Sequence, residues 1–290
     1  MGDAGPMGGA DQFVLAETLG RVWGSLVLRP YVFGFLAVYL TAAAVAWGWR
    51  RAIAFTVWAG GLAFAAEWSS TRVGVPFGLY HYTGATTGRE LYLANVPLFD
   101  SLSFTFLAYA SLGLAGQLLG HGAGGPPGAP GPGRPVTGAG ARLRLAGLAG
   151  LLMMWLDVVI DPLAVRGERW FLGRVFYYPE PGWYFGVPTA NFVGWVVVGV
   201  TIAWGWNVLA ARVGGAPPAW GGRLPARPYH AAGLYYLVLA FNLAVTAAVA
   251  EPALFWAGVL LHVPLAVAVV CSLRSREPTG RVPLGAGEPV

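Results

Sequence analysis

The feature that most constrains this chain is a recurrence of long apolar segments without any charged residue. A helix that crosses a membrane needs about 20 mostly apolar residues. Five charge-free segments approach or exceed that length: Tyr31–Trp49, Ser101–Leu119, Pro181–Ala211, Ala231–Ala250 and Ala253–Leu273. Ala52–Trp68 and Leu145–Pro162 are two further candidates, apolar except for carboxylates near their C-terminal ends. We therefore predict an all-α, polytopic integral membrane helical bundle with about seven transmembrane helices.

The composition supports a membrane protein and argues against a nucleic-acid partner. Hydrophobic residues make up 56% of the chain and charged residues 11%, whereas soluble domains carry about 25% charged residues. The 18 basic residues are all arginines, and they gather at the ends of the apolar segments instead of forming a basic stripe. The single cysteine, Cys271, excludes a disulfide framework and a cysteine-rich metal site.

The remaining segments suggest a simple domain organisation. Leu15, Leu19, Val22 and Leu26 recur at the spacing of one helix face, which predicts an amphipathic helix lying in the membrane interface. A Gly/Pro-rich stretch has the composition of a linker and lacks the ending of a phosphate-binding loop. The predicted parts are an N-terminal tail with the interfacial helix (1–30), the transmembrane catalytic bundle (31–273), the Gly/Pro-rich loop inside it (120–140) and a C-terminal tail (274–290).

Counting span by span places the acidic residues on one side of the membrane. More arginines fall on one side than on the other, which favours an external N-terminus in the cytoplasmic membrane. With seven alternating spans, one face receives Glu67, Asp100, Asp157, Asp161 and Glu251. The two long aromatic loops, 69–97 and 164–188, open on the same face. We expect the chemistry of this protein on that side.

Asp157 and Asp161 are the first candidates for catalysis. They lie four residues apart, which places them on one helix face about 6 Å apart, and Pro162 is expected to end that helix. Two carboxylates so close in an apolar setting cannot both ionise cheaply, so the pair retains a proton that it can donate. The alternative is a helix end whose carboxylates are solvated among lipid headgroups.

Glu67 is the second candidate. Apolar residues precede it and Trp68 follows it, so the carboxyl group tends to keep its proton, as a general acid requires. The alternative is a salt bridge to Arg72. Asp100 and Glu251 are weaker candidates, because each also fits the start of a helix.

Several side chains on the two loops are candidates for substrate binding. The rings of Tyr80, Tyr82, Tyr184 and Trp195 can stabilise a cationic intermediate through cation–π contacts. Their alternative role is in the aromatic belt that membrane proteins place at the interface. Asn191, at the start of a span, can either cap the helix or orient a water molecule.

Two residue types exclude whole classes of membrane protein. The four histidines are scattered without metal-ligand spacing, so we expect no metal and no cofactor. The chain contains no lysine, and a retinal Schiff base requires one. A rhodopsin-like function is therefore excluded.

Four ordered motifs together resemble the membrane carotenoid 1,2-hydratases, a family that covers γ-carotene 1'-hydratases and bisanhydrobacterioruberin hydratases. The motifs are Glu67–Tyr82, Val96-Pro97, Asp157–Pro162 and Tyr184–Trp195. The similarity extends over residues 30–272, and the N-terminal segment and the Gly/Pro-rich loop fall outside it.

The resemblance implies a cofactor-independent hydratase in carotenoid biosynthesis. Members add water across the terminal double bond of an acyclic end group and produce a tertiary alcohol without redox chemistry. The implied functional positions are Glu67, Tyr80, Tyr82, Asp157, Asp161 and Asn191. One carboxyl group would protonate C2', another would orient or deprotonate the water, and the aromatic rings would stabilise the cation between the two steps. The expected partners are a carotenoid such as γ-carotene or lycopene, the lipid bilayer, and other carotenoid enzymes.

Three other functions fit parts of the sequence. A lycopene-type end-group cyclase would form the same cation and let an internal double bond capture it. An intramembrane prenyltransferase would use Asp157 and Asp161 but needs a second Asp-rich motif, which the sequence lacks. A non-catalytic carotenoid carrier or scaffold would bind the polyene without converting it.

Overall fold

The computed structural model describes residues 9–120, 138–169, 172–214 and 230–274. Within them the chain forms a bundle of long helices with only four two-residue strands, which confirms the predicted all-α class. The helices are α1 (Gly9–Leu28), α2 (Pro30–Trp47), α3 (Trp49–Val73), α4 (Leu98–Leu118), α5 (Ala139–Ala164), α6 (Thr189–Leu209), α7 (His230–Ala248) and α8 (Pro252–Arg274). The predicted Gly/Pro-rich loop and C-terminal tail lie almost entirely outside the described residues.

Six helices of the described residues are long and apolar enough to cross a membrane: α2, α4, α5, α6, α7 and α8. The protein is therefore a multi-pass membrane protein. Helix α3 is longer than most of them, at 25 residues, but it includes Arg50, Arg51, Glu67 and Arg72. It packs against α2, α4 and α6 inside the bundle, and its role as the seventh span stays a prediction.

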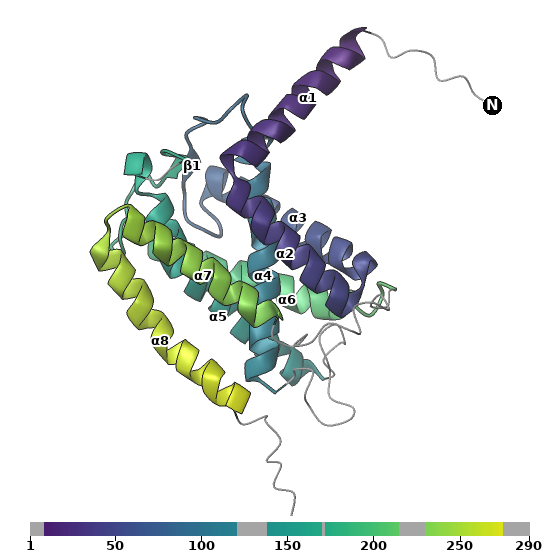
Figure 1. Cartoon of the computed structure of the whole chain (residues 1–290), viewed down its shortest axis with the longest axis vertical. Coiled ribbons are helices and arrows are strands. Elements are labelled where there is room, and N and C mark those ends of the chain that lie inside the picture. Colours follow the sequence, from purple (N-terminus) through teal and green to yellow (C-terminus); the bar gives the residue numbers. More distant parts are fainter. Residues whose placement is uncertain (1–8, 121–137, 170–171, 215–229, 275–290) are drawn as a thin grey trace, which may run out of the picture.

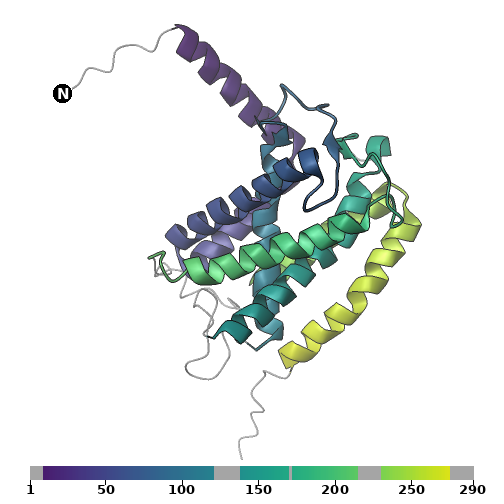
Figure 2. The same ribbon diagram turned by 180° about the vertical axis from the view of Figure 1, so that it is seen from behind.

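Helix α4 forms the centre of the bundle. It packs against α2, α3, α5 and α7, and 72% of its apolar window is buried inside the protein, compared with 22% for the peripheral α8. In Figure 1, α2 and α7 cross in front of α4, and Figure 2 shows α5 and α6 on the opposite side. The start of α4 is thus surrounded by other elements, and that end contains the candidate site.

Two glycines allow α5 and α6 to approach closely. A Cβ atom on Gly150 would lie 2.7 Å from the carbonyl oxygen of Val196, and one on Gly199 would lie 2.8 Å from the Cα of Gly150. Small residues at such crossings let helix backbones meet inside a membrane, where packing drives association. This contact fixes the relative position of the carboxylates on α5 and the polar residues at the start of α6.

Of two helix boundaries near the site, one differs from the prediction and one agrees with it. Helix α5 continues through Pro162 to Ala164, because a proline in the last turn breaks only one hydrogen bond and the chain still closes the turn with the Val165 N–H and the Asp161 carbonyl. Helix α6 starts at Thr189, directly after the predicted loop 164–188, and residues 181–188 of that loop contain a bridge between Tyr184 and Val187.

The two aromatic loops meet at one end of the bundle, as predicted. Strand β1 (His81–Tyr82) in the first loop pairs antiparallel with β4 (Phe176–Tyr177) in the second. A hairpin of β2 (Tyr92–Leu93) and β3 (Val96–Pro97) leads the first loop into α4, and a short 3-10 helix, η1 (Gly167–Arg169), follows α5. Figure 1 shows β1 at this end, which we call the loop end.

Helix α1 projects from the bundle in both views (Figures 1 and 2). Its apolar side chains are exposed, including Phe13 (71%), Val14 (60%) and Trp23 (66%). A helix is therefore present within the predicted N-terminal segment, and its location in the membrane interface stays a prediction.

Candidate active site

A cavity of about 150 Å³ lies at the loop end, beneath the two joined loops. Helices α2 to α7 and both loops contribute to its walls. Its polar lining includes three carboxylates, Glu67, Asp100 and Asp161, and most of the other lining residues are aromatic or aliphatic. We call this space the acidic cavity.

Glu67 lies near the end of α3 and is 4% exposed. The Tyr82 hydroxyl donates a hydrogen bond of 2.9 Å to its Oε1, and the Ser101 hydroxyl donates one to its Oε2. The alternative pairing with Arg72 does not form, since that guanidinium donates to Asn95 and lies over the Trp68 ring. Both oxygens of Glu67 therefore meet neutral hydroxyl groups at the cavity wall.

Asp157 and Asp161 lie one turn apart on α5, as predicted, but at different depths. Asp161 lines the acidic cavity, and the Tyr178 hydroxyl donates to its Oδ2 over 3.4 Å. Asp157 is fully buried behind it and accepts a hydrogen bond of 2.7 Å from Asn191 Nδ2. The two aspartates interact with each other, so Asp157 can act on the cavity only through Asp161 and Asn191.

Glu67 and Asp161 face the same cavity although they come from different helices. They are close enough to interact electrostatically. The sequence predicted one shared face for these carboxylates, and the fold brings them to one shared space. Two carboxyl groups across a mainly apolar cavity can divide two proton transfers between them.

Aromatic side chains cover the loop side of the cavity. The pairing of β1 with β4 places Tyr80 against Tyr82 (5.5 Å between ring centroids), Phe176 (5.7 Å) and Tyr178 (5.9 Å). Burial raises the pKa of Tyr80, Tyr82 and Tyr178 well above the ordinary phenol value. These loop tyrosines therefore stay neutral at physiological pH, so their hydroxyls can donate hydrogen bonds to carboxylates.

The other predicted binding residues divide into two groups. Asn191 and Trp195 line the cavity, and the Trp195 ring stacks on Phe104 with centroids 4.3 Å apart. Tyr184 does not line it and instead contacts Phe185 and Phe192. We therefore keep Asn191 and Trp195 in the candidate site and leave Tyr184 out.

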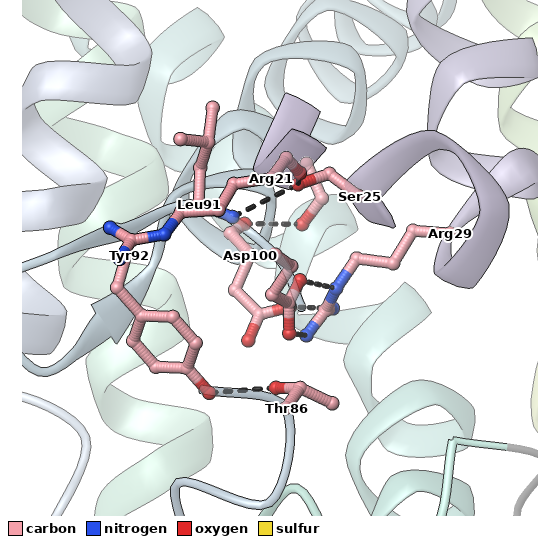
Figure 3. Close-up of polar contacts among 9 residues, drawn as sticks. Arg21, Ser25, Arg29, Thr86, Leu91, Tyr92 and Asp100 are labelled. Carbon is pink, nitrogen blue, oxygen red and sulfur yellow. Dashed lines mark hydrogen bonds and ion pairs between the residues drawn. The ribbon is translucent and has the colours of Figure 1, made fainter. Parts of the chain in front are cut away.

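An ion cluster that reaches the cavity wall through Arg29 and Asp100 was not anticipated from the sequence (Figure 3). Arg29, between α1 and α2, donates two hydrogen bonds to Glu90, of 2.6 and 3.1 Å, and pairs with Asp100 at the start of α4. Arg29 and Glu90 are 2% and 1% exposed. The partners lie 61 and 71 residues from Arg29 in the chain, so no local motif indicates the cluster.

Tyr178 and Ser101 were also missed as site residues. Tyr178 follows a strand whose position depends on pairing with the other loop, and Ser101 follows an aspartate that the sequence explains as a helix start. Neither belongs to a recognisable motif. Their hydroxyls contact the two cavity carboxylates, which becomes evident only when the helix ends are assembled.

Fold and site together define a multi-pass helical membrane protein with an acidic and aromatic cavity at one end. Residues 27–270 match the model of a family described as carotenoid biosynthesis protein. The match covers most of the chain, so this protein belongs to that family and has a role in carotenoid biosynthesis. No curated protein and no solved structure shows significant similarity to it.

Proposed function

We propose that this protein is a carotenoid 1,2-hydratase of the cell membrane. It adds water across the C1'–C2' double bond of an acyclic carotenoid end group and needs no cofactor. The observation that carries the proposal is the placement of Glu67 and Asp161 on one mainly apolar cavity in a member of a carotenoid biosynthesis family. Hydration of an isolated alkene requires a proton donor, a proton acceptor and a mainly apolar pocket, and the carboxyl groups among aromatic and aliphatic side chains support this proposal.

Glu67 is the proposed proton donor. Protonation of C2' leaves a tertiary cation at C1' and a carboxylate on Glu67. The Tyr82 and Ser101 hydroxyls both point at that carboxylate and stabilise it as it forms. Hydrogen bonds that are strongest to the charged form make the neutral acid a better donor.

The rings around the cavity stabilise the cation. Tyr80, Tyr82 and Trp195 line the space in which the cation would form. An aromatic face attracts a desolvated cation by about 2 kcal/mol. Because the carbocation carries no hydrogen-bond donor, ring faces are the most suitable groups to hold it.

Asp161 and Asn191 are the proposed water-binding groups. Asn191 donates its Nδ2 to Asp157, and this bond fixes the amide so that its carbonyl oxygen remains available to a water. Asp161 accepts the proton that the water releases when its oxygen bonds to C1'. One water is consumed, and the proton count is restored when Asp161 passes its proton back to Glu67.

These polar groups favour hydration over cyclisation. A cyclase must keep water away from the cation, so that an internal double bond can capture it. Here an asparagine and an aspartate share the cavity wall with the rings. Polar side chains of this kind retain ordered water inside proteins.

The test is expression of the intact protein in a host that accumulates lycopene or γ-carotene. The proposal predicts pigments heavier by one or two waters, with the chromatographic retention of tertiary alcohols. A cyclised product of unchanged mass would support the cyclase, and retention of unmodified pigment by the purified protein would support a carrier. Either result would replace the hydratase proposal.

A further inference from the structure

One buried charge cluster has no part in the proposed reaction. Arg29 forms a bidentate contact with Glu90 and a third contact with Asp100. Its guanidinium is 3% exposed, and the Glu90 side chain is fully buried. Burying charged groups costs several kcal/mol each unless they are paired and hydrogen-bonded. A cluster of this kind beside a cavity therefore needs a structural or a functional explanation.

The cluster reaches Glu67 through Tyr82. The Tyr82 hydroxyl donates to Glu67 Oε1 over 2.9 Å, and Asp100 lines the same cavity, near enough to Tyr82 for the two groups to interact electrostatically. A phenol has a single proton to donate. The Tyr82 hydroxyl can therefore donate a full hydrogen bond to only one of the two carboxylates, Glu67 or Asp100.

The cluster also reaches Glu67 along the backbone. Ser101 directly follows Asp100 in the first turn of α4, and its hydroxyl donates to Glu67 Oε2. Holding Asp100 therefore also holds Ser101. Both donors to Glu67 are linked to the contact between Arg29 and Asp100.

We propose that Arg29 is a positioning residue for the hydration reaction, holding Asp100 so that the hydroxyls of Tyr82 and Ser101 stay on Glu67. This inference rests on the proposed function. Arg29 supplies Asp100 with its own N–H donor and a neutralising charge. Without Arg29, Asp100 takes the hydrogen bond of Tyr82 and places an unpaired negative charge beside Glu67, which weakens Glu67 as a proton donor.

A purely structural role is the main alternative. In that case Arg29 only attaches the loop containing Glu90 to the bundle, as the neighbouring contact between Ser25 Oγ and the Leu91 N–H does. The two roles differ in one respect. If Arg29 acts by restraining Asp100, removing the charge of Asp100 must compensate for the loss of Arg29.

The experiment compares three full-length variants: E90Q as the reference, R29Q/E90Q, and R29Q/E90Q/D100N. Replacing Glu90 first avoids leaving a lone buried carboxylate when the arginine is removed. We expect kcat for formation of the tertiary alcohol to fall at least about tenfold in R29Q/E90Q, the size of one lost charge-assisted hydrogen bond. We expect KM and the yield of detergent-extracted protein to stay close to those of E90Q.

The triple variant decides the question. We expect R29Q/E90Q/D100N to recover to within about threefold of E90Q, since the unpaired charge of Asp100 is then removed and changes within one ion cluster compensate for each other. A triple variant as slow as R29Q/E90Q overturns the inference while leaving the hydratase proposal intact. If the wild-type protein forms no tertiary alcohol, the proposed function itself fails. Should the E90Q variants not accumulate, R29Q and R29Q/D100N make the same comparison.

Discussion

Glu67 and Glu251 lie at the same end of the bundle, in two different kinds of environment. Glu67 lines the acidic cavity and accepts hydrogen bonds from the neutral hydroxyls of Tyr82 and Ser101. Glu251, between α7 and α8, forms ion pairs with Arg166 (3.5 Å) and Arg169 (2.6 Å). Both carboxylates thus lie near a helix end. They differ in their partners, which are hydroxyl groups for Glu67 and guanidinium groups for Glu251.

The difference separates a reactive carboxyl group from a structural one. A glutamate paired with two arginines is held in a structural contact between chain segments. A glutamate that faces hydroxyls in an apolar cavity can exchange its proton with a substrate, because its charge is not already compensated. The following changes test whether this distinction governs the chemistry.

The largest effect is expected for Glu67→Gln. The amide keeps the shape of the side chain but cannot donate an acidic proton. Removing a general acid typically lowers the rate by about 10²–10⁴-fold. Pigment analysis of a lycopene-producing host should show almost no tertiary alcohol, with normal amounts of the variant in the membrane fraction. Wild-type product levels would remove Glu67 from the mechanism.

A second large loss is expected for Asp161→Asn. Without an acceptor for the proton of the water, the cation decays by losing a proton from carbon instead. Alcohol formation should fall by about 10²-fold, with a rise in isomerised or cyclised pigment of unchanged mass. Chromatography with mass detection separates these products. An unaltered ratio of alcohol to isomers would show that Asp161 does not handle the water.

A smaller loss is expected for Tyr82→Phe. The ring remains at the cavity wall, but the hydrogen bond to Glu67 is lost, and hydrogen bonds to charged groups contribute about 1.5–3 kcal/mol, so we expect a decrease of at least about tenfold. The matched control is Tyr39→Phe. Tyr39 is fully buried where Tyr82 is partly buried, bonds to Thr56 over 2.9 Å and does not line the cavity. Equal losses in both variants would point to general destabilisation.

The smallest effect is expected for Glu251→Gln. Partly exposed ion pairs contribute about 0–1 kcal/mol, so hydration should stay within about twofold of wild type. Thermal stability in detergent is the more sensitive measurement and should fall slightly. If the variant folds but loses its activity, Glu251 takes part in the reaction. The distinction between a reactive Glu67 and a structural Glu251 would then be wrong.

The sequence predicted the bundle and the gathering of the carboxylates at one end of it. Apolar segment length determines the helices, and strict alternation of spans places Glu67 and Asp161 at one end. The different depths of Asp157 and Asp161 were not predictable, because they depend on how α6 packs against α5, where Asn191 bonds to the fully buried Asp157. Helices α5 and α6 approach each other closely at Gly150 and Gly199. Residue spacing in the sequence does not predict this contact.

Contacts between distant segments account for most of the rest. Tyr178 reaches Asp161 only after β4 has paired with β1, and Arg29 reaches Glu90 only after the end of α1 has met the loop. Each of these residues looks ordinary in its local sequence. Their importance arises from assembly at the loop end, where the ends of several helices meet two aromatic loops.

The most direct test of the central claim uses purified wild-type protein and the Glu67→Gln variant with lycopene in water enriched in heavy oxygen. The account predicts that the wild-type product carries the heavy oxygen in a tertiary hydroxyl, without any added cofactor, and that the variant yields almost none. A product without the label, or equal labelling by both proteins, would contradict it.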